Sequence, residues 1–212
     1  MSEDGTAKGG HYSRPAAPRR LPDGAAAPAE PPSPIERRRA LSAILRSAAP
    51  NGEQMLYFAY GSNLNAAQMA RRCPDHKVVG VAVLRDHRLT FPLTSHDWGG
   101  GVSSVQAVHG SEVWGVVYEL GDADVESLDR YEGFRGPGDQ HNLYDREFAF
   151  VDLTRPDDGS IPRRVRALIY LARPSNPAPP SRRYLDTILE GARHHRLPED
   201  YLGSLARVAT LE

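Results

Sequence analysis

The pattern of apolar residues from position 55 onward restricts the fold more than any other feature. Seven stretches rich in Val, Leu, Phe and Tyr are typical of β-strands, at 55–60, 78–84, 87–91, 103–108, 112–120, 143–152 and 165–171. Helical patterns interrupt them, but strands and helices do not alternate as a βαβ fold requires. The sequence therefore predicts a mixed α+β domain, for which a small β-barrel is one arrangement.

Four helices are expected, at 65–72, 122–133, 181–195 and 197–208. Asn65, Asp122 and Ser181 are the predicted N-caps of the first three, because a short oxygen-bearing side chain accepts hydrogen bonds from the first turn. Gly133 is predicted to end the second helix, since glycine adopts the left-handed conformation readily.

The composition changes near residue 50. Residues 1–50 contain 8 of the 18 prolines and 11 alanines, with few large apolar side chains. Such a segment buries too little surface to offset its ordering entropy, so a largely disordered N-terminal extension is expected. Within it, Ser33 and Glu36 form a capping box at the start of an apolar pattern over 33–49. This pattern indicates either a short docking helix or a transient helix in a tail. Residues 51–212 are expected to form the folded domain.

Charge and composition exclude several classes of function. The net charge is −1, which gives no reason to expect nucleic-acid binding. No apolar run approaches the roughly 18 residues of a membrane span, and MSEDGTAKGG lacks the apolar region of a signal peptide. A cytoplasmic location is therefore expected. The single cysteine, Cys73, excludes an internal disulfide, and the eight histidines show no ligand motif, so no metal site is expected.

The stretch LYFAYGSNL, residues 56–64, begins as a buried strand and ends in three residues with little side-chain bulk. A strand that ends in Gly-Ser-Asn before a helix presents backbone N–H groups near a positive helix end, which suits an anion. The glycine allows close approach, and Ser62 and Asn63 offer hydrogen bonds. A phosphate and a small carboxylate are both candidates. The alternative is a tight turn that binds nothing.

Glu132 is the candidate acid or base. It lies in LDRYEGF, near the expected end of a helix, where the negative end of the helix dipole disfavours a charged carboxylate. If Tyr131 and Phe134 also desolvate it, its pKa rises toward the range that a general base uses. The alternative is an ordinary exposed glutamate in a last helical turn.

Four blocks of sequence together resemble the γ-glutamylcyclotransferase family. They are LYFAYGSNL, EVWGVVYEL at 112–120, LDRYEGF at 128–134, and the segment 178–208, which is similar to the C-terminal helices of that family. The resemblance covers residues 55–208 in order and implies a small mixed β-barrel with flanking helices. Residues 1–50 do not match the family pattern.

The resemblance implies an enzyme of γ-glutamyl and glutathione metabolism. The α-amine of a γ-glutamyl group attacks its own γ-carbonyl, which gives 5-oxoproline and releases an amino acid or amine, without cofactor or metal. The binding partner that the resemblance implies is a small γ-glutamyl substrate. The resemblance is also compatible with a homodimer. The resemblance gives Glu132 the acid/base role. It assigns substrate binding to eight residues: Tyr60, Gly61, Ser62, Asn63, Leu64, Tyr144, Tyr170 and Tyr184.

The chain departs from the family pattern after the glutamate. The linker from Glu132 to Tyr144 is several residues longer, and its Gly-rich part, 133–142, is expected to rim the pocket and affect which leaving group fits. The YGSNL form favours free γ-glutamyl amino acids as substrates. Two alternatives remain: an enzyme that removes a γ-glutamyl cap from a larger amine, and a binding protein that has lost turnover.

Overall fold

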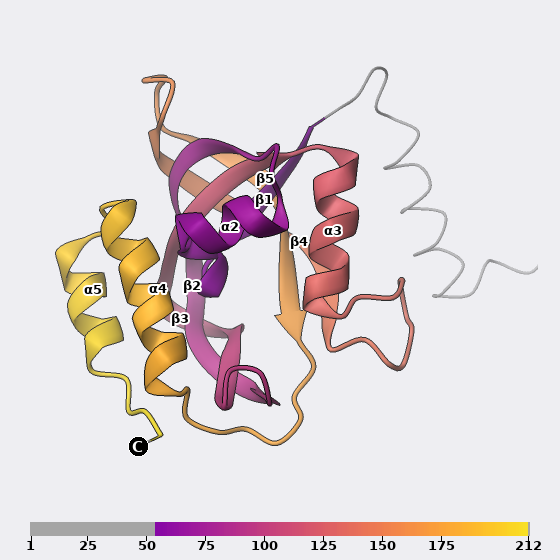
Figure 1. Ribbon diagram of the computed structural model, residues 1–212. Helices are drawn as coiled ribbons and strands as arrows, with labels where there is room; N and C mark the ends of the chain where they lie inside the picture. The colour runs from indigo at the N-terminus through magenta and orange to yellow at the C-terminus, as the bar shows by residue number, and fades with distance from the viewer. Residues whose placement is uncertain (1–53, 212) are drawn as a thin grey trace, which may run out of the picture.

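Five β-strands close into a barrel in the computed structural model, which describes residues 54–211 (Figure 1). The predicted extension 1–50 and its helical pattern lie outside the described residues. The order around the barrel is β1-β3-β2-β4-β5, with β1 and β5 parallel and the other neighbours antiparallel. The strands are β1 (Met55–Ala59), β2 (Lys77–Ser95), β3 (Gly100–Leu120), β4 (Tyr144–Pro156) and β5 (Arg163–Ala172). The predicted α+β class and small mixed barrel are confirmed.

The seven predicted strands become five because two expected breaks, one in each strand, are the two sides of a single bulge. The register between β2 and β3 shifts between Arg85 and His87, and the two strands continue on both sides of the shift. Asp86 and Gly110 both have positive φ there, 55° and 76°, and the Gly110 N–H donates to Asp86 Oδ1 over 2.8 Å. A bulge bends a strand without ending its pairing, so the runs on either side belong to one long ribbon.

The helices begin and end close to the predicted positions. Asn65 and Ser181 cap their helices through side-chain oxygens, as predicted, and Gly133, with φ 64°, ends α3. The prediction of Asp122 as a cap is wrong: Gly121 is the N-cap and Asp122 is the first helical residue. The elements are a single 3₁₀ turn η1 (Ser62–Leu64) and helices α2 (Ala66–Arg72), α3 (Asp122–Glu132), α4 (Arg182–His194) and α5 (Glu199–Ala206).

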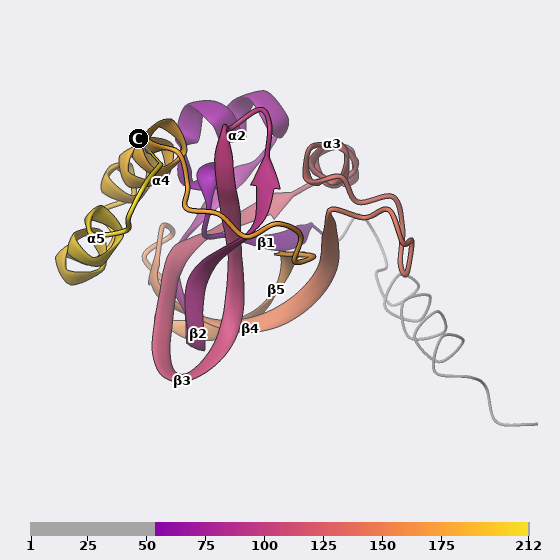
Figure 2. The same cartoon turned by 90° about the horizontal axis from the view of Figure 1, so that it is seen from below.

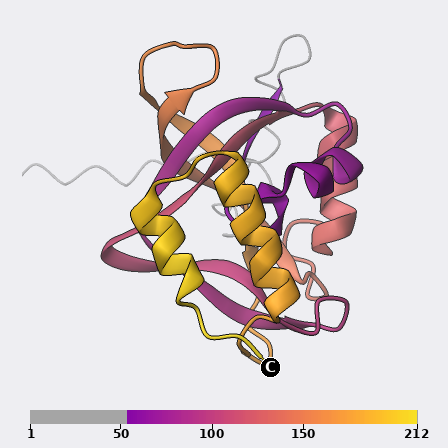
Figure 3. The ribbon, with the colours of Figure 1, turned by 60° about the vertical axis from the view of Figure 1, so that its left-hand side comes forward.

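The helices cover the outside of the barrel in two groups. Figures 1 and 2 both place α4 and α5 on one side of the barrel and α3 on the other, and Figure 3 shows α4 and α5 side by side across the strands. One buried cluster consists almost entirely of strand residues such as Phe58, Val117 and Ile169 and fills the barrel. A second joins the strands to the helices through Leu64, Leu128 and other apolar residues. No helix within residues 54–211 is long and apolar enough to cross a membrane.

Candidate active site

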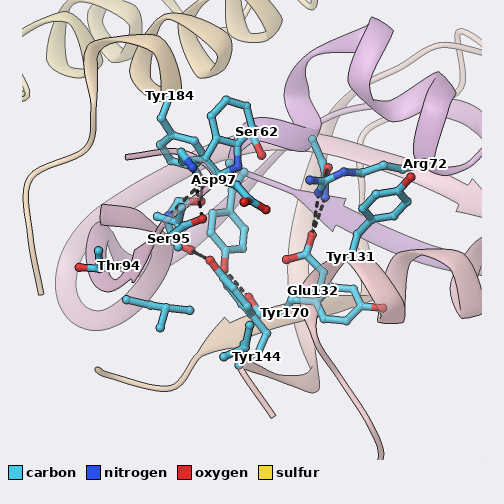
Figure 4. Close-up of a pocket in the computed structure, with 18 of the residues that line it drawn as sticks. Ser62, Arg72, Thr94, Ser95, Asp97, Tyr131, Glu132, Tyr144, Tyr170 and Tyr184 are labelled. Carbon is cyan, nitrogen blue, oxygen red and sulfur yellow. Dashed lines mark hydrogen bonds and ion pairs between the residues drawn. The ribbon is translucent and has the colours of Figure 1, made fainter. Parts of the chain in front are cut away.

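A cavity of about 430 Å³ opens where the end of β1, the end of α3 and the tip of the β2–β3 hairpin meet (Figure 4). Of the predicted site residues, all but Leu64 line it. Tyr131, expected beside Glu132, also lines the cavity. The lining further includes residues that were not predicted at the site, among them Tyr57, Arg72, Ser103, Leu143 and the hairpin segment 93–98.

The predicted ligand loop is the single turn η1 and the two residues before it. The N–H groups of Leu64 and Asn65 donate to the carbonyls of Gly61 and Ser62, which closes the turn. The first N–H groups of a helical turn have no partner within it. Leu64 itself lies outside the cavity, fully buried in the core, so the assignment of its side chain to the substrate is not supported by its position.

Two glycines let this loop pack closely against its neighbours. A Cβ on Gly61 would lie 2.0 Å from Ser103 Oγ, so the space beside Gly61 is taken by β3. This differs from the predicted reason for the glycine, which was close approach of a ligand. A Cβ on Gly191 of α4 would lie 2.2 Å from the carbonyl carbon of Leu64. The loop is therefore held between β3 and α4.

The amide of Asn63 connects the loop to the candidate catalytic carboxylate. Its Nδ2 donates to Glu132 Oε1 over 3.0 Å and to the Tyr57 hydroxyl over 2.8 Å. Its Oδ1 accepts from Gln68 Nε2 over 3.1 Å and from an Arg72 nitrogen over 2.9 Å. The Gln68 and Arg72 nitrogens can only donate hydrogen bonds, so the oxygen of the Asn63 amide has to face them. Its NH₂ group therefore faces Glu132.

Glu132 is the last residue of α3, and its side chain is only 13% exposed. Its Oε1 accepts from Asn63 and also lies 3.3 Å from an Arg72 nitrogen, and Figure 4 shows the carboxylate directed toward Arg72. Burial raises the pKa of Glu132, while Arg72 and the Asn63 hydrogen bond lower it by less. The alternative of an exposed glutamate does not hold.

The groups that desolvate Glu132 differ from those expected. Tyr131 is 57% exposed, with the Arg72 guanidinium 4.7 Å from its ring centroid. Phe134 does not line the cavity and instead lies against Arg146, 4.8 Å from ring centroid to guanidinium. Side chains from other elements desolvate the carboxylate instead. They include the buried Tyr57 of β1 and Tyr144 of β4, which line the same cavity.

The three tyrosines assigned by resemblance lie in the cavity with their hydroxyls bound to protein groups. Tyr144 donates to the Ser103 carbonyl over 2.9 Å, and Tyr184 accepts from the Ser103 N–H over 3.0 Å. Tyr170 donates to Asp129 Oδ1 over 2.7 Å, and the Tyr60 hydroxyl donates to the Tyr170 carbonyl. Burial raises the pKa of each of these tyrosines, so they are neutral at physiological pH. They form rigid walls with fixed dipoles.

Arg72 and the hairpin tip were missed because nothing local marks them. Arg72 is one of two arginines in the last turn of α2, a common position for a basic residue at the negative helix end. The sequence Asp97-Trp98-Gly99 indicates a turn between two strand runs, but not that the turn lies over the site. Conversely, the Gly-rich segment 133–142 was expected to rim the pocket, and only the next residue, Leu143, lines it.

The single cysteine does not line the cavity. Cys73 is fully buried, and burial raises the pKa of its thiol to about 12. Within residues 54–211, no group of three or more His, Cys, Asp or Glu side chains is placed to hold a metal ion.

Comparison with known proteins identifies relatives across most of the described chain. The family model of the AIG2-like family matches residues 112–205. The "Gamma-glutamylcyclotransferase" of Mus musculus is 31% identical over 165 residues, which is 76% of this chain and 82% of the mouse protein. The protein of the same name from Homo sapiens is 32% identical, over 75% of this chain and 81% of the human protein.

Solved structures agree with the sequence relatives. A structure described as "Gamma-glutamyl cyclotransferase" superposes with a TM-score of 0.66 at 31% identity, covering 76% of this chain and 90% of the other. YkqA from Bacillus subtilis shares the fold, with a TM-score of 0.60 at 22% identity, over 82% of this chain and 60% of YkqA. On the identity and coverage of its relatives, the chain belongs to the γ-glutamylcyclotransferase family.

Proposed function

We propose that this chain is a γ-glutamylcyclotransferase that converts a γ-glutamyl amino acid to 5-oxoproline and a free amino acid, with Glu132 as general base and then general acid. The names of the relatives support the reaction. The role of Glu132 rests on the position of its carboxylate. The carboxylate lines the cavity, burial raises its pKa, and only one of its two oxygens accepts hydrogen bonds from the described part of the chain. No hydrogen bond from within residues 54–211 reaches its Oε2. That oxygen is available to a substrate.

The reaction needs a group that carries protons from the attacking nitrogen to the leaving nitrogen. The α-amine of the substrate is an ammonium at neutral pH and cannot attack a carbonyl. Glu132 Oε2 takes a proton from it, and the free amine nitrogen then bonds to the γ-carbonyl carbon, whose oxygen becomes an oxyanion. Glu132 returns this proton to the leaving nitrogen, and the amide C–N bond breaks when the oxyanion collapses. The carboxylate then takes the second surplus proton from the ring nitrogen and passes it to the released amine. The products are 5-oxoproline, which keeps its α-carboxylate, and the leaving group as an ammonium, and Glu132 is again a carboxylate.

Positioning supplies a large part of the rate, because the attack is intramolecular. The flexible glutamyl chain has to be folded so that amine and carbonyl lie in contact, and rigid walls achieve this when they leave no room for extended shapes. Tyr57, Tyr144 and Tyr184 are buried and fixed by hydrogen bonds, so they suit this task. The N–H groups that begin η1 suit the α-carboxylate or the oxyanion.

The test is the formation of 5-oxoproline from γ-glutamyl-alanine and from glutathione. Glu132→Gln keeps the size of the side chain but removes the proton acceptor, so turnover is expected to fall by at least about 10²-fold. Glu126→Gln is the matched control, since Glu126 is exposed on the same helix. Near-normal turnover of Glu132→Gln would exclude Glu132 as the acid/base. Absence of 5-oxoproline from every γ-glutamyl substrate would exclude the reaction and favour a binding protein.

The reaction would belong to the turnover of γ-glutamyl compounds such as glutathione. A cytoplasmic location rests on the sequence prediction alone, and localisation of the full chain in its own cells tests it.

A further inference from the structure

The cavity has a closed end and an open mouth. The residues of the η1 loop and the tyrosine walls are buried, whereas Tyr131 and Leu143 at the other side are 57% and 53% exposed. Thr94, His96 and Asp97 of the hairpin tip are also exposed and line the same cavity. Since Glu132 and the η1 loop must both reach the γ-glutamyl head, the head occupies the closed end. The leaving group therefore occupies the mouth, between the hairpin tip and the side formed by Tyr131 and Leu143.

The hairpin tip is anchored, although it is exposed. The Ser181 hydroxyl donates to the Trp98 carbonyl over 2.5 Å, and the Trp98 ring meets Tyr184 edge-on with 4.9 Å between centroids. The Arg183 guanidinium lies 4.9 Å from the centroid of Trp98 and donates to the backbone carbonyl of Asp97. These contacts fix the backbone around Asp97 against the start of α4. Asp97 is thereby placed at the mouth, where it lines the cavity.

One acidic side chain of the cavity lining forms no ion pair. Arg72, His96, Asp97 and Glu132 are the acidic and basic residues of the lining. Arg72 is paired with Glu132, whereas no ion pair within the described chain involves Asp97 (its neighbour Arg183 donates to the backbone oxygen instead). The mouth therefore presents a carboxylate that forms no ion pair with a side chain of residues 54–211. Figure 4 shows it on the side of Thr94 and Ser95, with Tyr131 and Glu132 on the other side.

We propose that Asp97 determines the preferred leaving group, and that the preferred substrates are γ-glutamyl conjugates whose leaving amine carries an additional positive charge and no free carboxylate, such as a diamine. The inference rests on the proposed reaction and extends its leaving groups from amino acids to amines. A γ-glutamyl head is a zwitterion, so discrimination between substrates depends on the leaving group. A leaving group that carries a free carboxylate, as in γ-glutamyl-alanine or glutathione, is repelled by Asp97. A cationic one is attracted.

The experiment uses three substrates with the same head and leaving groups of similar size. Ethylenediamine supplies a cation, propylamine is neutral and alanine carries a carboxylate. The readout is kcat/KM for 5-oxoproline formation by the full chain, for the wild type, Asp97→Asn and Asp186→Asn. Asp186 is an exposed aspartate of α4 outside the cavity and provides the matched control.

The expected result is a change in a ratio. The wild type should prefer the cationic over the anionic substrate, and Asp97→Asn should reduce this preference at least about fivefold. That factor corresponds to the loss of one unit-charge interaction at about 4 Å in water. The preference of the wild type should also shrink in about 1 M salt, because exposed charges are screened. Asp186→Asn should leave the preference as in the wild type.

Other outcomes would overturn the inference. An equal loss on all three substrates in Asp97→Asn would mean that Asp97 binds the common head. An unchanged ratio in Asp97→Asn, with 5-oxoproline formed from all three substrates, would show that the mouth charge does not select, while the proposed reaction would stand. Failure of all three substrates in the wild type would instead contradict the proposed function. A loss of preference in Asp186→Asn equal to that in Asp97→Asn would mean that overall charge, not the mouth, is responsible.

Discussion

Removal of Arg72 should move the acid limb of the pH–rate profile to higher pH. A general base is active only when deprotonated, so kcat/KM falls as the pH drops through the pKa of Glu132. The Arg72 guanidinium favours the charged carboxylate and thereby lowers that pKa, against the larger opposite effect of burial. Without it, the carboxylate holds its proton to higher pH. Arg72→Gln should therefore lose activity first on the acid side.

The size of the shift follows from the distance between the charges. Arg72 and Glu132 approach to 3.3 Å. With the dielectric constant of water this separation gives about 1.3 kcal/mol, and a protein-like effective dielectric makes it larger. Since one pKa unit corresponds to about 1.36 kcal/mol, the acid limb should move up by at least about one pH unit. The two side chains are only 16% and 13% exposed, so solvent screening does not remove the effect.

The assay is kcat/KM for 5-oxoproline formation from about pH 4 to pH 9. Arg71→Gln is the matched control, because Arg71 is exposed on the same turn of α2 and does not line the cavity. Arg72→Lys keeps a cation and should restore most of the wild-type position. Melting temperatures separate a shifted pKa from an unfolded protein. An acid limb that stays in place or moves to lower pH in Arg72→Gln would refute the assignment of Glu132 as the titrating base.

Three further predictions concern the stability of the site and of the helices packed around it. Burial raises the pKa of Glu132 in the folded chain, which disfavours its charged form. Glu132→Gln should therefore raise the melting temperature at pH 7. This gain should vanish below about pH 4.3, where the carboxyl is protonated in the unfolded chain as well. An equal gain at both pH values would contradict the argument. Gly61→Ala forces a methyl group against Ser103 and should lower the unfolding free energy by about 1–3 kcal/mol. The loss should be smaller when Gly61→Ala is combined with Ser103→Ala. Additive effects of the two substitutions in denaturant titrations would contradict the clash. Gly191→Ala should destabilise the protein because its Cβ meets backbone, whereas Gly203→Ala in α5 meets only Arg207 at 3.5 Å and should stabilise it by about 0.5–1 kcal/mol; the same sign of change at both positions would contradict the packing argument.

Features that depend on neighbours in sequence were predictable. The caps at Asn65 and Ser181 and the stop at Gly133 each involve residues within one turn. The strand ends inside the long β2–β3 ribbon were not predictable, because a local interruption looks the same whether the chain leaves the sheet or bulges within it. Asp86 and Gly110 settle that question only by meeting across two strands.

The site shows the same limit. Glu132 was selected because it ends a helix, which is local information, but its protection from water comes from strands far away in the sequence. The charge of Asp97 could be read in the sequence, and its position at the cavity mouth could not, because α4 fixes the hairpin there through Ser181 and Trp98. The resemblance to a family supplied the tyrosines that no pattern marks.

The hydrogen bonds around Glu132 explain how one carboxylate can serve in both proton transfers. A buried carboxylate with no donors would keep its proton and could not act as a base at neutral pH. Here Asn63 and Arg72 both bind Oε1 and so limit the effect of burial on the pKa. Gln68 holds the amide of Asn63 in the orientation that donates. Because both donors use the same oxygen, the other remains open to the substrate nitrogen. The same arrangement thus moderates the pKa and directs the exchanged proton to Oε2.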